Sequence, residues 1–114
     1  CGARFDWRGD LSTAVACPGC GRAGGMRPDV VWFGEMPHRM DEIEAALGAA
    51  DLFVAIGTSG SVYPAAGFVA QAGDLGIRAL EVNLEPSDVA GLFDDGLYGP
   101  ATETVPALVA RLLA

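Results

Sequence analysis

The sequence predicts an α/β fold in which half of a doubly wound parallel sheet follows a small cysteine-bearing module. From residue 28 onward, short runs of β-branched and aromatic residues alternate with helical patterns, as they do in a parallel sheet covered by helices. Residues 1–27 instead hold six glycines and all three cysteines, and a stretch of this size and composition cannot bury a core of its own. The length of 114 residues, 51% of them hydrophobic, suits one globular domain.

Three strands are expected, and they would run parallel to one another. Residues 30–33 form the first candidate. Residues 52–56 are a continuous apolar run that Gly57 ends, as is typical of a strand buried on both faces. Residues 79–82 form the third candidate, which is broken at Asn83 and followed by a turn. Because three strands make a thin sheet with open edges, we expect further partners for it outside these residues.

Three helices are expected between and after these strands, at about residues 40–50, 65–75 and 104–113. In each helix, apolar residues recur every three or four positions, which places them on one face. The residues expected on these faces are Met40, Ile43 and Leu47, then Phe68, Val69 and Ala72, and finally Val105, Leu108, Val109 and Leu112. The order of strands and helices is that of half a Rossmann-like fold.

The charge balance excludes some classes of function. Seven arginines and no lysine stand against fifteen acidic residues, so the net charge is −8. A general nucleic-acid binder neutralises phosphates with basic residues, so we expect no nucleic-acid partner. No apolar run reaches the roughly eighteen residues that a membrane span needs. We therefore expect no membrane partner and a cytoplasmic location.

The cysteines indicate a metal site. Cys17 and Cys20 form a C-x-x-C pair, a spacing at which two thiolates reach one ion. Cys1 adds a third thiolate, whereas structural zinc normally takes four protein ligands. A cysteine three residues before Cys1 would complete a zinc ribbon, so we expect the natural protein to extend beyond this chain. Two alternatives remain, namely a redox or incidental pair of thiols, and His38 as the fourth ligand rather than a surface loop residue.

Polar residues follow two strands at what would be one edge of the sheet. Gly57-Thr58-Ser59-Gly60-Ser61 comes directly after the strand at 52–56, and Asn83 ends the strand at 79–82. Because parallel strands end at the same edge, these groups would meet where nucleotides bind in such folds. The sequence lacks the Gly-Lys-Ser/Thr ending of a phosphate loop, which argues against a nucleoside triphosphatase. A simple turn has the same composition and stays the alternative.

The stretch from Arg27 to Glu35, R-P-D-V-V-W-F-G-E, is the most distinctive in the chain. Its apolar run ends in an aromatic residue, a glycine and a glutamate. One interpretation is a core strand followed by a turn. The other is a sheet edge that pairs with an extended peptide, in which main-chain hydrogen bonds give affinity and pockets give selectivity.

Taken together, these motifs resemble those of the sirtuins, a family of NAD-dependent protein-lysine deacylases, and especially its bacterial branch. The resemblance runs in family order through C-P-G-C-G, R-P-D-V-V-W-F-G-E-M-P, I-G-T-S-G-S-V-Y-P-A-A, V-N-L-E-P and G-P-A-T, and it covers essentially the whole chain. It implies that residues 1–27 are part of a small zinc-ribbon module and residues 28–114 the C-terminal half of a Rossmann-like NAD-binding domain. It also implies a structural zinc ion, with Cys17 and Cys20 as the second ligand pair and Cys1 as the last member of the first.

The resemblance further implies two sets of binding residues. Those expected to bind NAD are Gly57, Thr58, Ser59, Asn83, Leu84, Glu85 and Ala101. Those expected to bind an acyl-lysine peptide, which would add as a strand, are Val31, Phe33, Gly34, Glu35 and Val62. Val31 would accept the acyl-lysine amide at its backbone carbonyl, and Phe33 would wall the acyl-lysine tunnel.

The family's catalytic histidine acts as a general base toward a ribose hydroxyl and belongs to a His-Gly motif upstream of the first cysteine pair. His38 follows F-G-E-M-P and does not match that position. We therefore expect the chain to be the C-terminal part of a deacylase that transfers the acyl group to ADP-ribose with release of nicotinamide, and to be inactive alone. The alternative is a non-catalytic module that binds peptides or ADP-ribose. A small zinc-ribbon interaction protein would leave the strand-end motifs unexplained.

Overall fold

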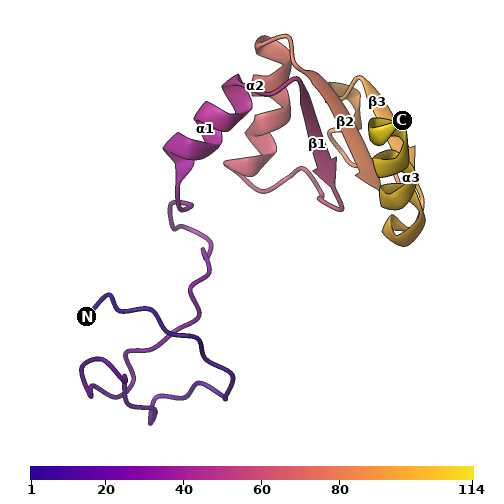
Figure 1. Cartoon of the computed structure of the whole chain (residues 1–114). Helices are drawn as coiled ribbons and strands as arrows, with labels where there is room; N and C mark the ends of the chain where they lie inside the picture. The colour runs from indigo at the N-terminus through magenta and orange to yellow at the C-terminus, as the bar shows by residue number, and fades with distance from the viewer. The chain divides into compact units, whose positions relative to one another are not determined.

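The computed structural model describes all 114 residues and divides them into two compact units, Cys1–His38 and Arg39–Ala114. All helices and strands lie in the second unit (Figure 1). None of the helices has the length and apolar character that crossing a bilayer requires. Along the chain the elements are α1 (Met40–Gly48), β1 (Leu52–Ile56), the 3₁₀ helix η1 (Ala65–Gly67), α2 (Phe68–Asp74), β2 (Arg78–Asn83), the 3₁₀ helix η2 (Ala90–Leu92), β3 (Asp95–Tyr98) and α3 (Ala101–Leu113).

The three strands form one parallel sheet in the order β1, β2, β3. Val54 of β1 pairs with Leu80 of β2, and Val82 of β2 pairs with Leu97 of β3. β2 is therefore the central strand, and α2 is the crossover helix between β1 and β2. The α/β class and the parallel half-sheet that the sequence predicts are confirmed.

The core of the second unit forms where helices cover the two faces of β2. Alternate residues of a strand point to opposite faces. On one face, Leu80 and Val82 pack with Leu108 of α3. Toward the other face, Ala79 is buried, as is Ala72 of α2, the helix that contacts β2 there. Figure 1 shows α2 and α3 on opposite sides of the sheet.

The helix α3 buries only part of the apolar face that its sequence predicts. Leu108 is buried and Val105 packs against the core. Val109 is 47% exposed, however, and Leu112 is 58% exposed. The predicted stripe is only half covered because a sheet of three short strands does not reach along the whole helix.

The strand predicted at residues 30–33 does not form. The segment belongs to the first unit, which contains no strand that could pair with it. Its backbone polar groups form hydrogen bonds with side chains instead: the Val30 carbonyl accepts one from Arg27, and the Trp32 N–H donates one to Glu35. A run of strand-forming residues needs a neighbouring strand to become one.

The third strand of the sheet is β3, where the sequence predicts a turn. Asp95 and Gly96 are residue types that strands disfavour, so this four-residue segment carries no strand signal. Its conformation comes from pairing with β2, in which Leu80 lies opposite Asp95 and Asn83 opposite Tyr98.

Three smaller predictions also need correction. β1 is half-buried rather than buried on both faces, and Ile56 is 50% exposed, because β1 is an edge strand. The predicted helix at 65–75 opens with η1 and becomes α-helical only at Phe68, and the last helix begins at Ala101 rather than at residue 104.

The unit Cys1–His38 contains neither helix nor strand. Its one regular feature is an isolated antiparallel bridge between Ala16 and Ala23. Cys17 is its only buried residue, so an apolar core does not hold this unit together. The division of the chain at residue 28 stays a prediction.

Candidate functional site

Three thiols gather in the first unit. The Sγ atoms of Cys1, Cys17 and Cys20 lie within 4.8 Å of one another, and those of Cys1 and Cys17 are 3.7 Å apart. Tetrahedral zinc with bonds of about 2.3 Å holds its sulfur ligands roughly 3.8 Å apart, so this donor set fits one zinc ion. His38 does not belong to the cluster, and its Nε2 lies 3.5 Å from Oδ1 of Asp29 instead.

The backbone around Cys17 holds the thiols in this arrangement. The N–H of Cys17 donates to the carbonyl of Arg22 at 2.9 Å, and the N–H of Gly21 donates to the carbonyl of Cys17 at 2.8 Å. Hydrogen bonds from the backbone N–H groups of Gly19 and Cys20 lower the pKa of the Cys17 thiol. Because the thiolate is the form that binds metal, the turn favours a metal ligand at this position.

A second candidate site lies in the second unit, at the edge of the sheet where β1 and β2 end. Six of the seven residues expected to bind NAD meet there, because parallel strands end at one edge. The seventh, Ala101, begins α3 and does not line this site. An open hollow of about 270 Å³ is lined by Gly57, Thr58, Ser59, Asn83, Leu84, Glu85, Pro86, Ser87 and Asp88.

The side chain of Asn83 ties the two sides of the hollow together. Its Nδ2 donates to the carbonyl of Thr58 at 2.8 Å, and its Oδ1 accepts the N–H of Leu84 at 2.9 Å. The N–H of Gly57 extends the strand ladder by donating to the carbonyl of Val82 at 2.8 Å. One amide side chain therefore sets the spacing between the loop after β1 and the loop after β2.

A close approach joins the same two loops at Gly60. A Cβ atom at this position would collide with the Val89 side chain, and the backbone φ is +67°. Glycine is the residue that meets both conditions without strain. Packing against Val89 therefore explains the glycine at position 60, whereas a simple exposed turn would not need glycine for packing.

The lining of the hollow offers hydroxyl, amide and carboxylate groups but no cation. The Oγ1 of Thr58 accepts the N–H of Gly60 at 3.2 Å, while Glu85 and Asp88 are exposed. Such groups suit the hydroxyls of a ribose. A phosphate at this position would find no positive side chain.

A buried carboxylate supports the loop after β2. Glu81 is 1% exposed, its Oε1 accepts the N–H of Ser87 at 3.2 Å, and its Oε2 accepts the hydroxyl of Tyr98 at 2.9 Å. Burial favours the neutral acid, but hydrogen bonds from Ser87 and Tyr98 outweigh it and hold the pKa of Glu81 below its ordinary value. The ionised Glu81 therefore anchors Ser87, which lines the hollow, to the central strand.

Tyr98→Phe is expected to lower the free energy of unfolding by about 1–3 kcal/mol, because it leaves a buried charged oxygen without its donor. A lowered folded-state pKa stabilises the fold above the unfolded pKa, and that contribution is lost as the pH falls through the folded pKa. The difference from the parent is therefore largest at neutral pH and shrinks below about pH 4. Thermal unfolding against pH measures it, with the exposed Tyr63→Phe as control. Equal melting temperatures for both variants at pH 7 would contradict this role of Tyr98.

The residues expected to bind a peptide lie in both units. Four belong to the irregular end of the first unit, and the fifth is an exposed residue after β1; they are Val31, Phe33, Gly34, Glu35 and Val62. Phe33 is 91% exposed, and the backbone of Val31 makes no hydrogen bond within the protein. The N–H of Glu35 already donates to the carbonyl of Trp32 at 3.1 Å, so of its backbone groups only the carbonyl is free for a peptide.

Some residues of these sites lie outside the motifs that sequence reasoning used. Pro86, Ser87 and Asp88 line the hollow, and the continuation of the V-N-L-E-P motif could have indicated them. Glu81 had one signal, a charged residue inside an apolar strand. Nothing in the sequence pairs Arg27 with Glu35, because their contact depends on the folded loop.

Comparisons with known proteins agree with this geometry. A family model described as the Sir2 family matches residues 3–64. An NAD-dependent protein deacylase of Caulobacter vibrioides is 62% identical over 114 residues, which cover 100% of this chain and 48% of the relative. A mutant Sir2 homologue in complex with ADP-ribose has a TM-score of 0.80 at 30% identity, over 92% of this chain and 42% of that one. Sir2Af2 bound to a myristoylated histone peptide has a TM-score of 0.73 at 34% identity, over 88% and 44%.

The fold is Rossmann-like: a parallel half-sheet has a crossover helix, and a polar hollow lies where two of its strands end. Within this class, the chain belongs to the Sir2 family. It spans about half the length of the relatives that it matches.

Proposed function

We propose that this chain is the C-terminal part of an NAD-dependent protein-lysine deacylase, which transfers the acyl group of lysine to ADP-ribose and releases nicotinamide. One observation carries the proposal: the motif residues that follow β1 and β2 line one polar hollow at the edge of the sheet. The Caulobacter protein, an NAD-dependent protein deacylase, is similar over the whole chain.

In this proposal the hollow binds the adenosine side of NAD. Thr58, Ser59 and Glu85 provide groups that hydrogen bond with ribose hydroxyls, and Asn83 keeps the two loops at a fixed spacing. Ala101 would lie near the adenine. The lack of a cation in the lining suits a free ribose hydroxyl better than a ribose phosphate. The similar Sir2 homologue in complex with ADP-ribose supports this assignment.

The acyl-lysine peptide would bind at Val31, Phe33, Gly34, Glu35 and Val62. The unpaired carbonyl of Val31 is available to the acyl-lysine amide, and the exposed ring of Phe33 is available to the lysine side chain. The Sir2Af2 structure with a myristoylated histone peptide supports a substrate of this kind.

Zinc would be structural, with Cys1, Cys17 and Cys20 as three of its ligands. The sulfur spacing and the absence of an apolar core in the first unit support this role. The zinc ion would hold the unit together and take no part in the reaction. The only histidine, His38, follows F-G-E-M-P and does not match the His-Gly motif of the family, so we propose that the general base is not among these residues and that they are inactive alone.

Asn83→Ala tests the nucleotide site in the complete product of the gene that encodes this chain. The change removes the hydrogen bond that joins the two loops and a second one within the loop after β2, so the affinity for ADP-ribose is expected to fall about tenfold to a hundredfold. Titration calorimetry with ADP-ribose and the KM for NAD measure the effect, and the KM for the peptide is expected to change little.

Gln71→Ala provides the control, because this amide side chain of α2 does not line the hollow. Lysine deacylation by the gene product, and none by the 114 residues alone, would support the proposal. ADP-ribose binding without any turnover would favour the non-catalytic module instead. ADP-ribose affinity that is the same in both variants and the parent would show that the hollow is not the nucleotide site.

A further inference from the structure

We propose that the ion pair between Arg27 and Glu35 is a positioning device, which holds residues 28–35 in the shape that presents Val31 and Phe33 to the acyl-lysine peptide. The inference rests on the proposed peptide-binding role of this segment. It assigns to the side chains of Arg27 and Glu35 the task of holding the segment in shape, whereas Val31 and Phe33 would contact the peptide. Residues 28–35 are called the clamped loop below.

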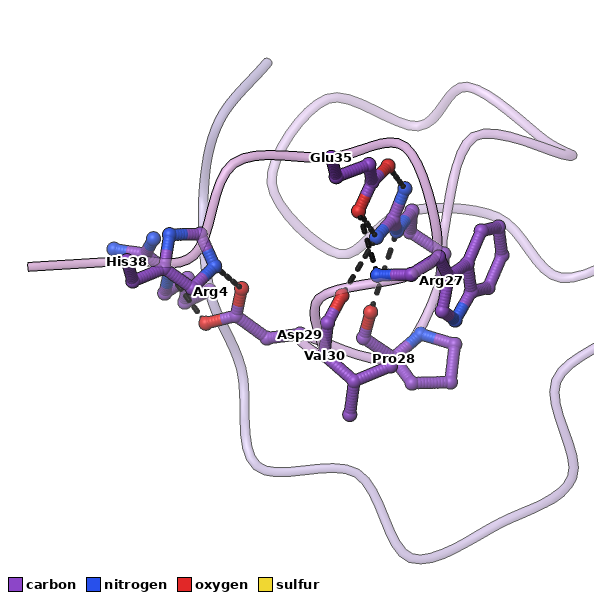
Figure 2. Close-up of polar contacts among 8 residues, drawn as sticks. Arg4, Arg27, Pro28, Asp29, Val30, Glu35 and His38 are labelled. Carbon is purple, nitrogen blue, oxygen red and sulfur yellow. Dashed lines mark hydrogen bonds and ion pairs between the residues drawn. The ribbon is translucent and has the colours of Figure 1, made fainter. Parts of the chain in front are cut away.

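The guanidinium of Arg27 binds at the base of the clamped loop with several hydrogen bonds. Its Nη1 donates to Oε1 of Glu35 at 2.6 Å and its Nη2 donates to Oε2 at 2.8 Å, which makes a two-pronged contact. The same Nη2 donates to the carbonyl of Val30 at 2.7 Å, and Nε lies 3.4 Å from the carbonyl of Pro28. Figure 2 shows these contacts converging on Arg27. Only arginine has the planar fork that makes such a set.

The carboxylate of Glu35 fixes the other side of the clamped loop. Its Oε2 accepts the N–H of Trp32 at 3.0 Å, and the N–H of Glu35 donates to the carbonyl of Trp32 at 3.1 Å. The Arg27 guanidinium also lies 4.0 Å from the centre of the Trp32 ring, a contact that favours the cation. The two ends of the loop and its middle are thus tied together.

The hydrogen bonds of the clamped loop alternate along the chain. The carbonyl of Val30 binds Arg27 and the N–H of Trp32 binds Glu35, whereas Val31 and Phe33 make no hydrogen bond within the protein. An extended peptide pairs with such alternate free groups. The Arg27–Glu35 pair therefore leaves the backbone groups of Val31 free for a peptide, and Phe33 is 91% exposed.

Both partners are charged at neutral pH. Hydrogen bonds from Arg27 and from the Trp32 N–H lower the pKa of Glu35 to about 2, and the Glu35 carboxylate raises the pKa of Arg27. The side chains are 42% and 40% exposed, and pairs at such exposure contribute little to global stability. We therefore expect the pair to affect the shape of the loop more than the stability of the protein.

Arg27→Ala and Arg27→Lys in the complete gene product test the inference. Both remove the fork, and the lysine variant keeps the charge. The peptide KM is expected to rise about tenfold for Arg27→Ala and roughly threefold or more for Arg27→Lys, because the loop must be ordered when the peptide binds. The KM for NAD should stay within about twofold, and the melting temperature within about 2 °C.

Arg39→Ala is the control, because it breaks another exposed arginine–carboxylate pair, with Glu42, that lies outside the clamped loop. It should leave both KM values unchanged. An unchanged peptide KM in Arg27→Ala, or an equal rise in the KM for peptide and for NAD, would overturn the inference. The proposed function would still stand if the wild-type protein is active. A wild-type protein that does not turn over the peptide would contradict both the inference and the proposed function. If Arg27→Ala does not fold, Arg27→Lys decides by the same KM comparison.

Discussion

Cys17→Ser is expected to abolish zinc binding in the complete gene product and, with it, the ordered structure of the unit Cys1–His38. This unit has one buried residue, which is Cys17 itself, and neither helix nor strand. Structural zinc contributes about 10–16 kcal/mol of apparent binding free energy in small modules. Such a term is as large as the whole stability of an ordinary domain, roughly 5–15 kcal/mol, so a unit without an apolar core depends on it.

Zinc content by elemental analysis and amide hydrogen exchange over residues 1–38 measure this effect. Ser12→Ala is a suitable control, because Ser12 lies in the same unit and is not a member of the thiol cluster. One equivalent of zinc retained by Cys17→Ser, or unchanged exchange after chelation, would contradict a structural zinc site. A disulfide that forms reversibly in the absence of zinc would favour the redox interpretation of the C-x-x-C pair.

Leu108→Ala is expected to destabilise the unit Arg39–Ala114 by about 2–5 kcal/mol. Leu108 is 6% exposed and packs against Leu80 and Val82 of the central strand. Removing its side-chain carbons leaves a cavity between α3 and the sheet. Because an ordinary domain is stable by only about 5–15 kcal/mol, the change would remove a large share of the stability of this unit.

Urea unfolding followed by far-UV circular dichroism measures this loss. Leu113→Ala is the matched control, since it removes the same atoms from the same helix at a position that is 82% exposed. It is expected to change the free energy of unfolding by less than about 0.5 kcal/mol. Equal losses in the two variants would mean that α3 does not cover the sheet as it does in Figure 1.

Local patterns in the sequence were sufficient for much of the fold. The apolar run before Gly57 and the strand before Asn83 are both present as β1 and β2, and α1 begins at the predicted residue, Met40. The Gly-Thr-Ser and Asn-Leu-Glu segments meet at the carboxyl edge of the sheet. These features follow from residue periodicity and from the direction of parallel strands, which are properties of short stretches of chain.

Pairing and burial could not be predicted in the same way. The segment at 30–33 has strand-forming residues but no strand beside it, whereas Asp95–Tyr98 has poor strand formers but lies along β2. Strand formation depends on a neighbour that is distant in the sequence. The same reason explains why the faces predicted for β1 and α3 are only half covered.

By itself, the sequence determined the class of fold, the order of most elements, the three thiols and the polar residues at the strand ends. The tertiary structure decided which residues work together. It placed Asn83 against Thr58, closed the loop of Arg27 onto Glu35, and buried Glu81 beneath Ser87. Each of these contacts joins side chains or backbone groups that the chain brings together only by folding, so no local pattern of residues can encode them.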